Sequence, residues 1–439
     1  MPDFAISTDP AVQRQLDRLT ALSPGADILG LGRITRLLER VGNPQLRLPP
    51  VLHVAGTNGK GSTCAFLRAA IEAAGMRAHV YSSPHLVRFN ERIRLAGSLI
   101  DDAQLAPLLE EVLDQGGDIG ASFFEVTTAA ALLAFARTPA DACIVEVGLG
   151  GRLDATNVIP QPAVTGIAQL GIDHQAFLGD TLAAIAAEKA GIVKQGVPLV
   201  TMDYPDDIAA VVREAARAAG AAVFVQGEAW DFEAGDGVLR YRDAAGEVVT
   251  PLPVLAGTHQ PANLALSIAM LRHQQSLRVP DAALAIAAGS ARWPARMQRL
   301  RPGPLTALLP EGSEVWLDGG HNANAADAVS AAMHDVAKGR PLQLVLGMLA
   351  NKDAATMLDR FAPLAEALVA VPVPGHEHHA PAKLAEAARV RGLTAMEADD
   401  LPHALRLIAE RPAGSPLVLI LGSLYLAGVA LAQNDELPD

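Results

Sequence analysis

The sequence predicts an α/β protein built on mostly parallel sheets. Short apolar runs alternate with alanine-rich segments of helical periodicity almost from end to end, the pattern that arises where helices connect parallel strands. The 439 residues are 50% hydrophobic and correspond to two or three domains of roughly 150 residues each, so the chain can bury large cores.

Apolar runs in the first half of the chain are predicted to be buried strands of one sheet, and later runs to be strands of a second. Helical segments such as Ser62–Ala74, which ends at Gly75, and Phe124–Arg137 separate the first runs. Residues 227–253 mix apolar positions with charges and glycines, which indicates an antiparallel excursion. The predicted strands are Val51–Ala55, Ala78–Tyr81, Ala142–Val147, Ala163–Ile167 and Pro198–Val200, followed by Val315–Leu317, Gln343–Leu346, Ala367–Val371 and Leu417–Leu421.

Residues 293–304 mark the clearest domain boundary. They contain three prolines, three arginines and a glycine, and the alternation of strands and helices restarts after them. We therefore predict a larger N-terminal domain of residues 1–296 and a smaller C-terminal α/β domain of residues 297–439.

The composition argues against several partners. With 48 acidic and 35 basic residues the net charge is −13, whereas binding to a nucleic-acid backbone needs a dense basic surface. The longest apolar run, residues 417–432, is interrupted by glycines and a serine, and its 16 residues are fewer than the ~20 that span a bilayer. The N-terminus has no secretory pattern. We expect a cytoplasmic protein with neither nucleic-acid nor membrane partners.

A glycine-rich turn between a buried strand and a helix start is the strongest chemical signal. Residues 56–62 have the sequence G-T-N-G-K-G-S, shorter than the standard G-x-x-x-x-G-K-[ST] phosphate loop (P-loop) and with a glycine after the lysine. Glycines let N–H groups point at phosphate oxygens, Lys60 reaches the terminal phosphates, and the Ser62 or Thr63 hydroxyl lies near Mg²⁺. The alternative is an ordinary glycine turn. The predicted nucleotide contacts are Thr57, Asn58, Gly59, Lys60, Gly61 and Ser62.

Glu146 lies at the carboxyl end of a predicted buried strand. In a doubly wound sheet this edge faces the phosphate loop. A lone carboxylate there is costly unless it is paired, so Glu146 is either a Mg²⁺ ligand or a salt-bridged structural acid. Mg²⁺ prefers oxygen ligands, which makes the Ser83 hydroxyl a reasonable companion, whereas His174 by itself indicates a satisfied loop histidine.

Lys189 is predicted to lie on the apolar face of a helix. Leu182, Ile185, Ala186 and Lys189 have helical spacing, and Asp180 is the expected N-cap. The alternative is a lysine that extends to solvent at the helix end, just before Gly191. A desolvated lysine has a lowered pKa, and its neutral amine can react with carbon dioxide to form a carbamate.

Several segments resemble one family. Residues 55–62 are similar to the loop of ATP-dependent amide ligases, which include the folylpolyglutamate synthases and the muramyl ligases. Residues 146–157, E-V-G-L-G-G-R-L-D-A-T-N, match the folylpolyglutamate synthase signature without a gap, and muramyl ligases do not share S-P-H-L at 83–86 followed by E-R-I. The likeness runs from about Leu29 to Tyr425. Further matches are residues 123–127, D-H at 173–174, E-K-A-G-I at 188–192, H-Q-x-x-N at 259–263, D-G-G-H-N at 318–322 and G-S-L at 422–424.

The resemblance, strongest to bifunctional bacterial members that also act as dihydrofolate synthases, implies an ATP-dependent ligase. It implies a Mur-ligase-like P-loop ATPase domain and a smaller Rossmann-like domain, with ATP held between them. L-Glutamate would be joined to dihydropteroate or to reduced folates through an acyl phosphate. The implied catalytic residues are Lys60, Glu146, His174 and Lys189. The implied ligands of two Mg²⁺ ions are Ser83, Glu146, His174 and a carbamylated Lys189, and the second half of the nucleotide site is Asn263, Arg296, Asp318 and His321.

Three segments are candidates for the pterin pocket. Residues 27–30 resemble the pterin-binding I-D-L-G-L segment of the family with the Ile and Asp reversed, although a helix-entry loop is the alternative. Residues 122–125 and 153–155 are stronger candidates, and either of two phenylalanines can stack on the pterin. The predicted residues are Asp27, Ile28, Leu29, Gly30, Ser122, Phe123, Phe124, Glu125, Leu153, Asp154 and Ala155.

Three positions depart from the family pattern: Ala295 replaces a Gly, Ala323 a Pro, and Asn351 an Asp. The alternatives to a bifunctional enzyme are a monofunctional folylpolyglutamate synthase, a muramyl-type amino-acid ligase, and a nucleotide-dependent regulatory protein without ligase activity. We expect a monomer whose partners are small molecules.

Overall fold

The computed structural model describes residues 5–22, 29–411 and 414–439, which form two compact units. The first unit comprises residues 1–254 with 260–292 and the last residue, and the second comprises residues 255–259 with 293–438. After a short first passage at residues 255–259, the chain enters the second unit again at Trp293, where the proline- and arginine-rich segment begins. The predicted division into an N-terminal domain of residues 1–296 and a C-terminal domain of residues 297–439, each with its own function, stays a prediction.

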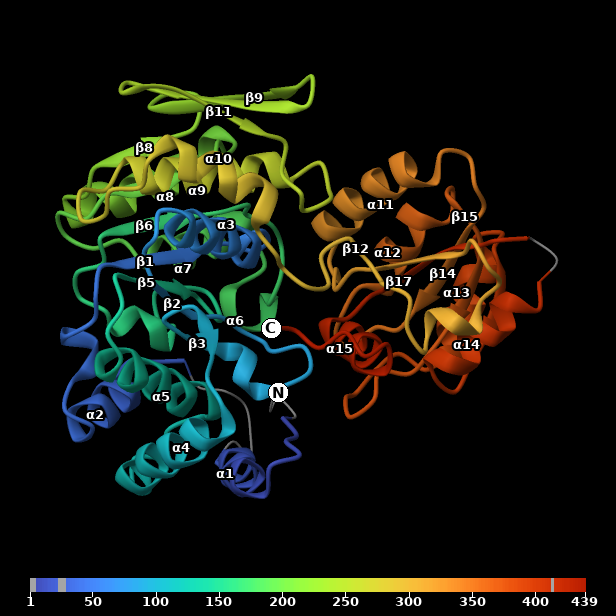
Figure 1. The fold of residues 1–439 in the computed structure, drawn as a ribbon, viewed down its shortest axis with the longest axis horizontal. Helices are drawn as coiled ribbons and strands as arrows, with labels where there is room; N and C mark the ends of the chain where they lie inside the picture. Colours follow the sequence, from blue (N-terminus) through green and yellow to red (C-terminus); the bar gives the residue numbers. More distant parts are fainter. Residues whose placement is uncertain (1–4, 23–28, 412–413) are drawn as a thin grey trace. The chain divides into compact units, whose positions relative to one another are not determined.

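The first unit is built on an eight-stranded sheet with the order β4-β3-β2-β5-β1-β6-β7-β8 (Figure 1). The strands from β2 to β8 in this order are parallel, and β3 and β4 extend the sheet with antiparallel pairs. The strands are β1 (Val51–Ala55), β2 (Ala78–Tyr81), β3 (Ile93–Leu95), β4 (Ser98–Leu99), β5 (Ala142–Glu146), β6 (Val164–Ile167), β7 (Leu199–Thr201) and β8 (Val223–Val225).

The central strands β1, β2, β5 and β6 are buried along their whole length. The predicted runs agree with their bounds to within one residue at each end. Such strands are easy to recognise, because helices on both faces of a parallel sheet favour continuous apolar runs. The predicted α/β class with a mostly parallel sheet is confirmed.

Helices cover both faces of this sheet. Figure 1 shows α3 (Lys60–Ala73), α9 (Gln260–Arg272) and α10 (Asp281–Ser290) on one side, and α4 (Asp102–Gly116) and α5 (Phe123–Arg137) on the other. The helix α3 contacts β1, β2 and β5, while α9 contacts β6 and β7. Other helices of the unit are α1 (Pro10–Ala21), α2 (Gly32–Arg40), α6 (Gln175–Leu178), α7 (Leu182–Ala190) and α8 (Asp206–Ala219).

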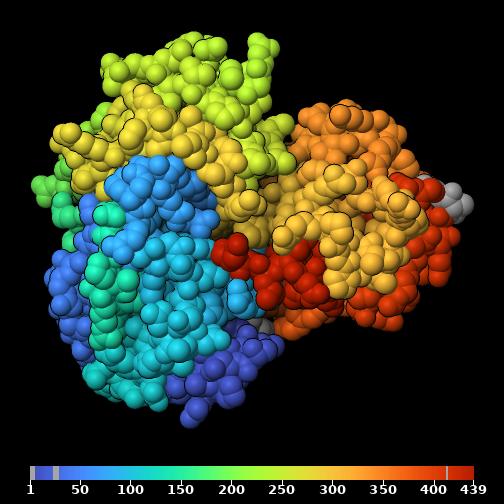
Figure 2. All heavy atoms as spheres, viewed as in Figure 1, coloured from blue at the N-terminus to red at the C-terminus, as the bar shows by residue number. Residues whose placement is uncertain are grey.

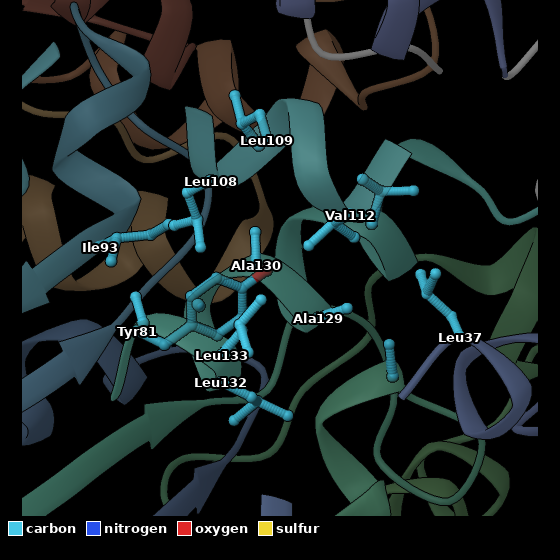
Figure 3. Close-up of a cluster of buried hydrophobic side chains, with 14 of the residues drawn as sticks. Leu37, Tyr81, Ile93, Leu108, Leu109, Val112, Ala129, Ala130, Leu132 and Leu133 are labelled. Carbon is cyan, nitrogen blue, oxygen red and sulfur yellow. The ribbon is translucent and has the colours of Figure 1, made fainter. Parts of the chain in front are cut away.

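A buried apolar cluster fills the space between the sheet and the helices α2, α4 and α5. Figure 3 shows the Tyr81 ring of β2 beside Leu133 and Ala130 of α5, with Leu108 of α4 nearby. The Tyr81 hydroxyl is paired at 3.0 Å with the Thr128 hydroxyl, which satisfies the polar end of a fully buried ring. This packing fixes α5, whose first turn carries predicted pterin contacts.

The antiparallel segment predicted at residues 227–253 is confirmed as a three-stranded sheet with the order β11-β10-β9. Its strands are β9 (Trp230–Gly235), β10 (Val238–Asp243) and β11 (Gly246–Pro251). In the space-filling view its yellow-green atoms lie at the surface of the first unit, next to the yellow atoms of α9 and α10 (Figure 2). The sheet is distant in sequence and topology from the strands that carry the predicted site.

The second unit has a six-stranded sheet with the order β12-β13-β17-β14-β15-β16, in which β12 alone pairs antiparallel. Its strands are β12 (Gln298–Arg299), β13 (Glu314–Leu317), β14 (Leu342–Leu346), β15 (Ala365–Ala370), β16 (Thr394–Glu397) and β17 (Leu417–Leu421). Its helices are α11 (Ala323–Ala337), α12 (Ala354–Phe361), α13 (Pro381–Val390), α14 (Leu401–Ala409) and α15 (Leu424–Gln433).

The long apolar run near the C-terminus is divided between two elements. The strand β17 ends at Leu421, and α15 starts at Leu424 after the N-cap Ser423, whose hydroxyl accepts from the Tyr425 N–H at 3.1 Å. Within the described residues no helix is both long and apolar enough to cross a bilayer.

Candidate active site

Four adjacent parallel strands of the large sheet end at one edge, and a predicted site segment follows each of them. Ser83 follows β2, Glu146 is the last residue of β5, the glycine-rich loop follows β1, and His174 lies in the segment after β6. The strand register keeps these four ends level. The carboxyl edge of a parallel sheet is where ligands bind in open α/β folds.

The glycine-rich loop is held tightly between β1 and α3. Gly56 and Gly59 both have positive φ, 151° and 82°, which a residue with a side chain adopts only with strain. A Cβ at Gly59 would also overlap the Asn263 side-chain oxygen. The main-chain N–H groups of Thr57 and Asn58 donate to Gln169 O at 2.8 and 3.2 Å, which ties the loop to the segment after β6.

Lys60 is the first residue of α3, and its side chain folds back over the loop. Its Nζ donates to Gly56 O at 3.0 Å and to Thr57 O at 3.3 Å. The ammonium therefore lies at the helix N-terminus, where both the helix dipole and the lysine favour a bound anion. This geometry suits the predicted phosphate contact.

The structure brings predicted residue Asn263 against the loop. Asn263 lies in the first turn of α9 and its amide donates to Gln260 Oε1 at 3.1 Å. The Gln260 amide donates in turn to the buried Ser62 hydroxyl at 3.2 Å. The first turns of α3 and α9 are thus joined by side-chain hydrogen bonds. Gly61 lies between Lys60 and Ser62 in the same turn of α3.

Lys189 lies on the buried face of α7, as predicted, and is 4% exposed. Its Nζ donates to Gly56 O at 2.9 Å. Burial and, secondarily, the nearby Lys60 lower the pKa of Lys189 to about 7. The expected N-cap, Asp180, is wrong: the Thr181 hydroxyl accepts from Ala184 N at 3.2 Å, because Thr181 is the residue next to the first helical position.

Glu146 and His174 differ in their surroundings. Glu146 is 5% exposed, and its charge contributes, after burial, to a raised pKa of the neighbouring Cys64 thiol. His174 is the N-cap residue of α6 and has a left-handed backbone, φ 53°. Its side chain is 48% exposed, and Nε2 lies 3.9 Å from the Asp173 carboxylate. Among the described residues, no group of three His, Cys, Asp or Glu side chains could hold a metal ion. A metal site here would need the Ser83 hydroxyl or a modified lysine.

The loop after β5 is organised around a buried carboxylate. Asp154 accepts from the Leu149 N–H at 2.8 Å and from the Thr156 N–H at 3.0 Å, and burial raises its pKa. The Thr156 hydroxyl is also 2.9 Å from Nε2 of the fully buried His53 in β1, whose pKa burial lowers to about 3. These bonds hold Leu153, which is half-buried, and the buried Ala155 beside the strand ends.

The two phenylalanines at the start of α5 have different environments. Phe123 is buried, and its ring lies 5.5 Å from the guanidinium of the fully buried Arg92. Phe124 is half-buried, and its ring occupies the space that a Cβ at Gly148 would need. Phe124 therefore lies against the loop after β5, and we favour it as the ring that stacks on a pterin.

The polar side chains at the start of α5 form hydrogen bonds within the protein. The Ser122 hydroxyl caps α5, and the Glu125 carboxylate accepts from Ser122 N at 2.7 Å. The same carboxylate oxygen of Glu125 accepts from Arg33 Nε in α2 at 2.9 Å. Arg33 was not predicted as a site residue, because nothing in a single sequence pairs it with a glutamate 92 positions away.

The predicted N-terminal pterin segment is described in part. Asp27 and Ile28 lie outside the described residues, whereas Leu29 and Gly30 are half-buried directly before α2. Arg33 of α2 forms an ion pair with Glu125, so the helix that follows this segment contacts the first turn of α5. His85 also belongs to the region, since its Nδ1 accepts from Arg92 Nε at 2.9 Å.

Residues predicted to complete the nucleotide site lie in the second unit around Asp318. The buried Asp318 carboxylate accepts from Met297 N at 2.8 Å and from Gly320 N at 2.7 Å. Arg296 lies between Ala295 and Met297, which both have a left-handed φ, and His321 Nδ1 is 2.9 Å from Gly319 O. The aspartate thus shapes the turns that present Arg296 and His321.

The three departures from the family pattern fall in definable places. Ala295 has φ 57°, where glycine would be free of strain. Ala323 is the first residue of α11, a position that favours proline but tolerates alanine. Asn351 is exposed, two residues before Asp353, the N-cap of α12.

Similarity to known proteins decides the family. The family model described as Mur ligase, glutamate ligase domain, matches residues 296–424. The dihydrofolate synthase/folylpolyglutamate synthase of Bacillus subtilis (strain 168) is 32% identical over 420 residues, which cover 90% of this chain and 93% of that protein. The chain belongs to the folylpolyglutamate synthase family.

Solved structures of folylpolyglutamate synthases extend the similarity to almost the whole chain. The structure of E. coli FolC in complex with DHPP and ADP has a TM-score of 0.87 and 31% identity, and covers 98% of both chains. A bifunctional folylpolyglutamate synthase/dihydrofolate synthase with Mn, AMPPNP and L-glutamate bound has a TM-score of 0.82 and 31% identity, and covers 97% of this chain and 98% of that one. The resemblance inferred from the sequence motifs is therefore confirmed.

Proposed function

We propose that this protein is an ATP-dependent ligase that joins L-glutamate to dihydropteroate, which forms dihydrofolate, and to reduced folates, which forms folylpolyglutamates. One observation carries the proposal: the glycine-rich loop, Ser83, Glu146 and the segment of His174 all leave level ends of four adjacent parallel strands. Family membership supports it, since a relative of almost the same extent bears both enzyme names.

In the first step, a carboxylate oxygen of the pterin substrate attacks the γ-phosphorus of ATP, and the bond to the β–γ bridging oxygen breaks. The products are an acyl phosphate and ADP. Two anions must approach each other, so the main obstacle is electrostatic. Lys60, the first-turn N–H groups of α3 and the helix dipole would offset this repulsion.

In the second step, the amine of glutamate attacks the acyl carbon. A tetrahedral intermediate forms, loses a proton from nitrogen and expels phosphate, which leaves the amide. The acyl phosphate must be kept from water for this to compete with hydrolysis. We propose that Asn263, Arg296, Asp318 and His321 contribute to nucleotide binding. Asp318 would act by holding the turns around Arg296.

The residues at the strand ends fit Mg²⁺, which prefers oxygen ligands. Glu146 is a scarcely exposed carboxylate, and Ser83 offers a hydroxyl after the neighbouring strand. When bound, Mg²⁺ would neutralise charge on the triphosphate. A solved relative with Mn, AMPPNP and L-glutamate bound supports a divalent cation. We propose two such ions, with His174 as a further ligand.

We propose that Lys189 carries a carbamate that completes the metal site. Formation of a carbamate requires a neutral amine, and a buried lysine with a pKa of about 7 supplies one near neutral pH. The carbamate converts a cation into an anionic oxygen ligand, which suits Mg²⁺ better than an ammonium does.

The test is a ligase assay with parallel substrates. The enzyme is incubated with ATP, Mg²⁺ and L-glutamate together with dihydropteroate, tetrahydrofolate or a muramyl precursor, and ADP and the amide product are both measured. Product from both folate substrates supports the proposal, while product from tetrahydrofolate alone indicates a monofunctional folylpolyglutamate synthase. Product only from the muramyl precursor, or none from any substrate, would overturn it.

A further inference from the structure

Asn157 joins two segments of the proposed active site through a single amide nitrogen. Its Nδ2 donates to Arg152 O in the loop after β5 and to Gly191 O at the end of α7, both at 3.0 Å. An amide nitrogen carries two hydrogens in fixed directions and so suits two separate carbonyl acceptors. Because Asn157 is 6% exposed, water hardly competes for these bonds.

The two segments joined by Asn157 are in direct main-chain contact. The Arg152 N–H donates to Glu188 O at 2.7 Å. A Cβ at Gly151 would lie 2.7 Å from Glu188 O and 3.0 Å from Lys189 Cα, and a Cβ at Gly191 would overlap Arg152. With no side chains between the two backbones, a shift of the loop is transmitted directly to Lys189.

A second link between the loop and α7 is more exposed. Arg152 and Glu188 form an ion pair at 2.7 Å, but the Arg152 side chain is 57% exposed. Solvent screens such pairs, which contribute little to stability. The buried side-chain link is therefore Asn157, which acts beside the main-chain bond from Arg152 N to Glu188 O. The main-chain oxygen of Asn157 also accepts from Lys194 Nζ at 2.9 Å, three residues beyond Gly191.

The geometry points to Asn157 as a positioning residue that couples the pterin-binding loop to Lys189. The inference rests on the proposed function, in which Lys189 carries the metal-binding carbamate, and on the pterin contacts predicted for residues 153–155. Asn157 itself bonds to main-chain atoms of the loop and of α7. It acts by fixing the loop and the C-terminal end of α7 as one body, which sets the direction in which Lys189 Nζ leaves the helix.

The test is a graded series at Asn157 with a matched control. Asn157→Ser keeps one donor, and Asn157→Ala keeps none. The control is Gln274→Ala, because Gln274 is also 6% exposed and its Nε2 also donates to two carbonyls, Leu271 O at 2.9 Å and Leu277 O at 2.7 Å. Both alanine variants lose two buried amide-to-carbonyl bonds, and Gln274→Ala also loses the bond that Gln274 Oε1 accepts from Leu277 N at 2.8 Å, so it is the more severe truncation. Only Asn157 faces the proposed site.

Three quantities are measured on the full chain. Hydrogen exchange of peptides covering residues 149–157 and 182–191 reports whether the loop and α7 loosen together. Carbon-13 NMR after equilibration with labelled bicarbonate reports the carbamate, with Lys189→Met to assign its signal. Steady-state kinetics with dihydropteroate and ATP gives kcat and both KM values.

For Asn157→Ala we expect faster exchange in both peptides, loss of most of the carbamate signal, a fall of about tenfold to a hundredfold in kcat and a raised KM for dihydropteroate. The KM for ATP rises less than the KM for dihydropteroate, because the contacts that Lys60, Thr57 and Asn58 make in the glycine-rich loop do not pass through Asn157. Asn157→Ser is intermediate in each quantity and serves alone if the alanine variant does not fold. Gln274→Ala leaves all three unchanged.

Two results would overturn the coupling. One is exchange that rises in the loop peptide of Asn157→Ala and Asn157→Ser without rising in the α7 peptide. The other is a pattern in the Asn157 variants that Gln274→Ala reproduces. A wild-type protein with no ligase activity on any substrate would instead refute the proposed function, while the exchange measurement would still decide whether Asn157 joins the two segments.

Discussion

Lys189 and Lys60 donate hydrogen bonds to the same main-chain oxygen, that of Gly56, at 2.9 and 3.0 Å. The two ammonium groups come from different helices, α7 and α3, and meet at the first residue of the glycine-rich loop. Burial, and secondarily the charge of Lys60, lowers the pKa of Lys189 to about 7. The contact therefore prepares the Lys189 amine to be neutral near neutral pH.

Replacing Lys189 by methionine should change how stability depends on pH. The folded pKa is about 7 and the ordinary value is 10.5, so between these pH values the unfolded chain binds more protons than the folded one. The free energy of unfolding of the wild type therefore rises with pH across this window, and the penalty for burying the ammonium is largest below it. We expect Lys189→Met to be the more stable protein near pH 7, with an advantage that narrows towards pH 10.

Urea unfolding at a series of pH values, in buffers free of carbon dioxide, measures this effect. A difference between the two proteins that stays constant from pH 7 to 10 would contradict the lowered pKa.

Lys60→Ala should abolish turnover without unfolding the protein. The Lys60 Nζ bonds are made to two loop carbonyls in part-buried positions, and Gly56 O keeps its bond from Lys189, so their loss costs about 1 kcal/mol each. ADP formation with dihydropteroate and glutamate should fall to background, while the thermal unfolding temperature stays close to that of the wild type. The control is Lys383→Ala, an exposed position on α13 of the second unit. Normal turnover of Lys60→Ala would remove the lysine from the mechanism.

Gly59→Ala should weaken nucleotide binding for two reasons that can be separated. Alanine at φ 82° costs about 1–2 kcal/mol, and its Cβ overlaps the Asn263 side chain. We expect ADP binding, measured by calorimetry, to weaken about tenfold or more.

The double variant with Asn263→Ala should show coupling between the two positions. Truncation of Asn263 removes the overlap but not the backbone strain, so the combined loss should be smaller than the sum of the single losses. Strict additivity would show that the overlap plays no part.

Gly148→Ala should act on the pterin substrate alone. The new methyl group would need space that the Phe124 ring occupies, so the ring must turn away from the loop after β5. We expect the KM for dihydropteroate to rise about tenfold, while the KM for ATP stays within about twofold. Equal increases in both KM values would mean that the change disturbs the strand ends as a whole.

His53→Met should make the protein less sensitive to acid. Burial lowers the pKa of His53 to about 3 from its ordinary 6.5, so between these values the unfolded chain binds the extra proton. Stability that depends on the neutral ring is complete above pH 6.5 and is lost as the pH falls towards 3. Denaturant unfolding from pH 7 to 4 should give a shallower decline for the variant. Parallel declines would show that His53 is not a source of acid sensitivity.

The sequence was sufficient to predict the central strands of the large sheet and the order of the site segments along the chain, whereas the short strands β3, β4, β8, β12 and β16 were missed. The strands β1, β2, β5 and β6 are buried on both faces, so each shows as an apolar run, and the chemistry-bearing residues follow their carboxyl ends. The buried face of α7 was also predictable, because Ile185 and Lys189 follow helical spacing.

Contacts between distant parts of the chain were not predictable. Nothing local pairs Arg33 with Glu125, or His53 with Thr156, since these contacts exist only after the sheet has assembled. The helix start at Thr181 was missed by one residue because aspartate and threonine are both good N-caps, and only the hydrogen bond distinguishes them.

The level strand ends have a consequence for engineering the enzyme. The predicted site residues on the sheet of the first unit follow the carboxyl ends of β1, β2, β5 and β6. The turns that enter these strands and their parallel neighbour β7 therefore lie at the opposite rim. One such turn, residues 195–196 before β7, is exposed and contains Gly196 at φ 70°. Surface turns of this kind tolerate added chain. A fluorescent reporter or an affinity tag inserted there would leave the substrate-facing rim intact. Labels can therefore be attached at one rim of the sheet while the residues of the proposed site are varied at the other.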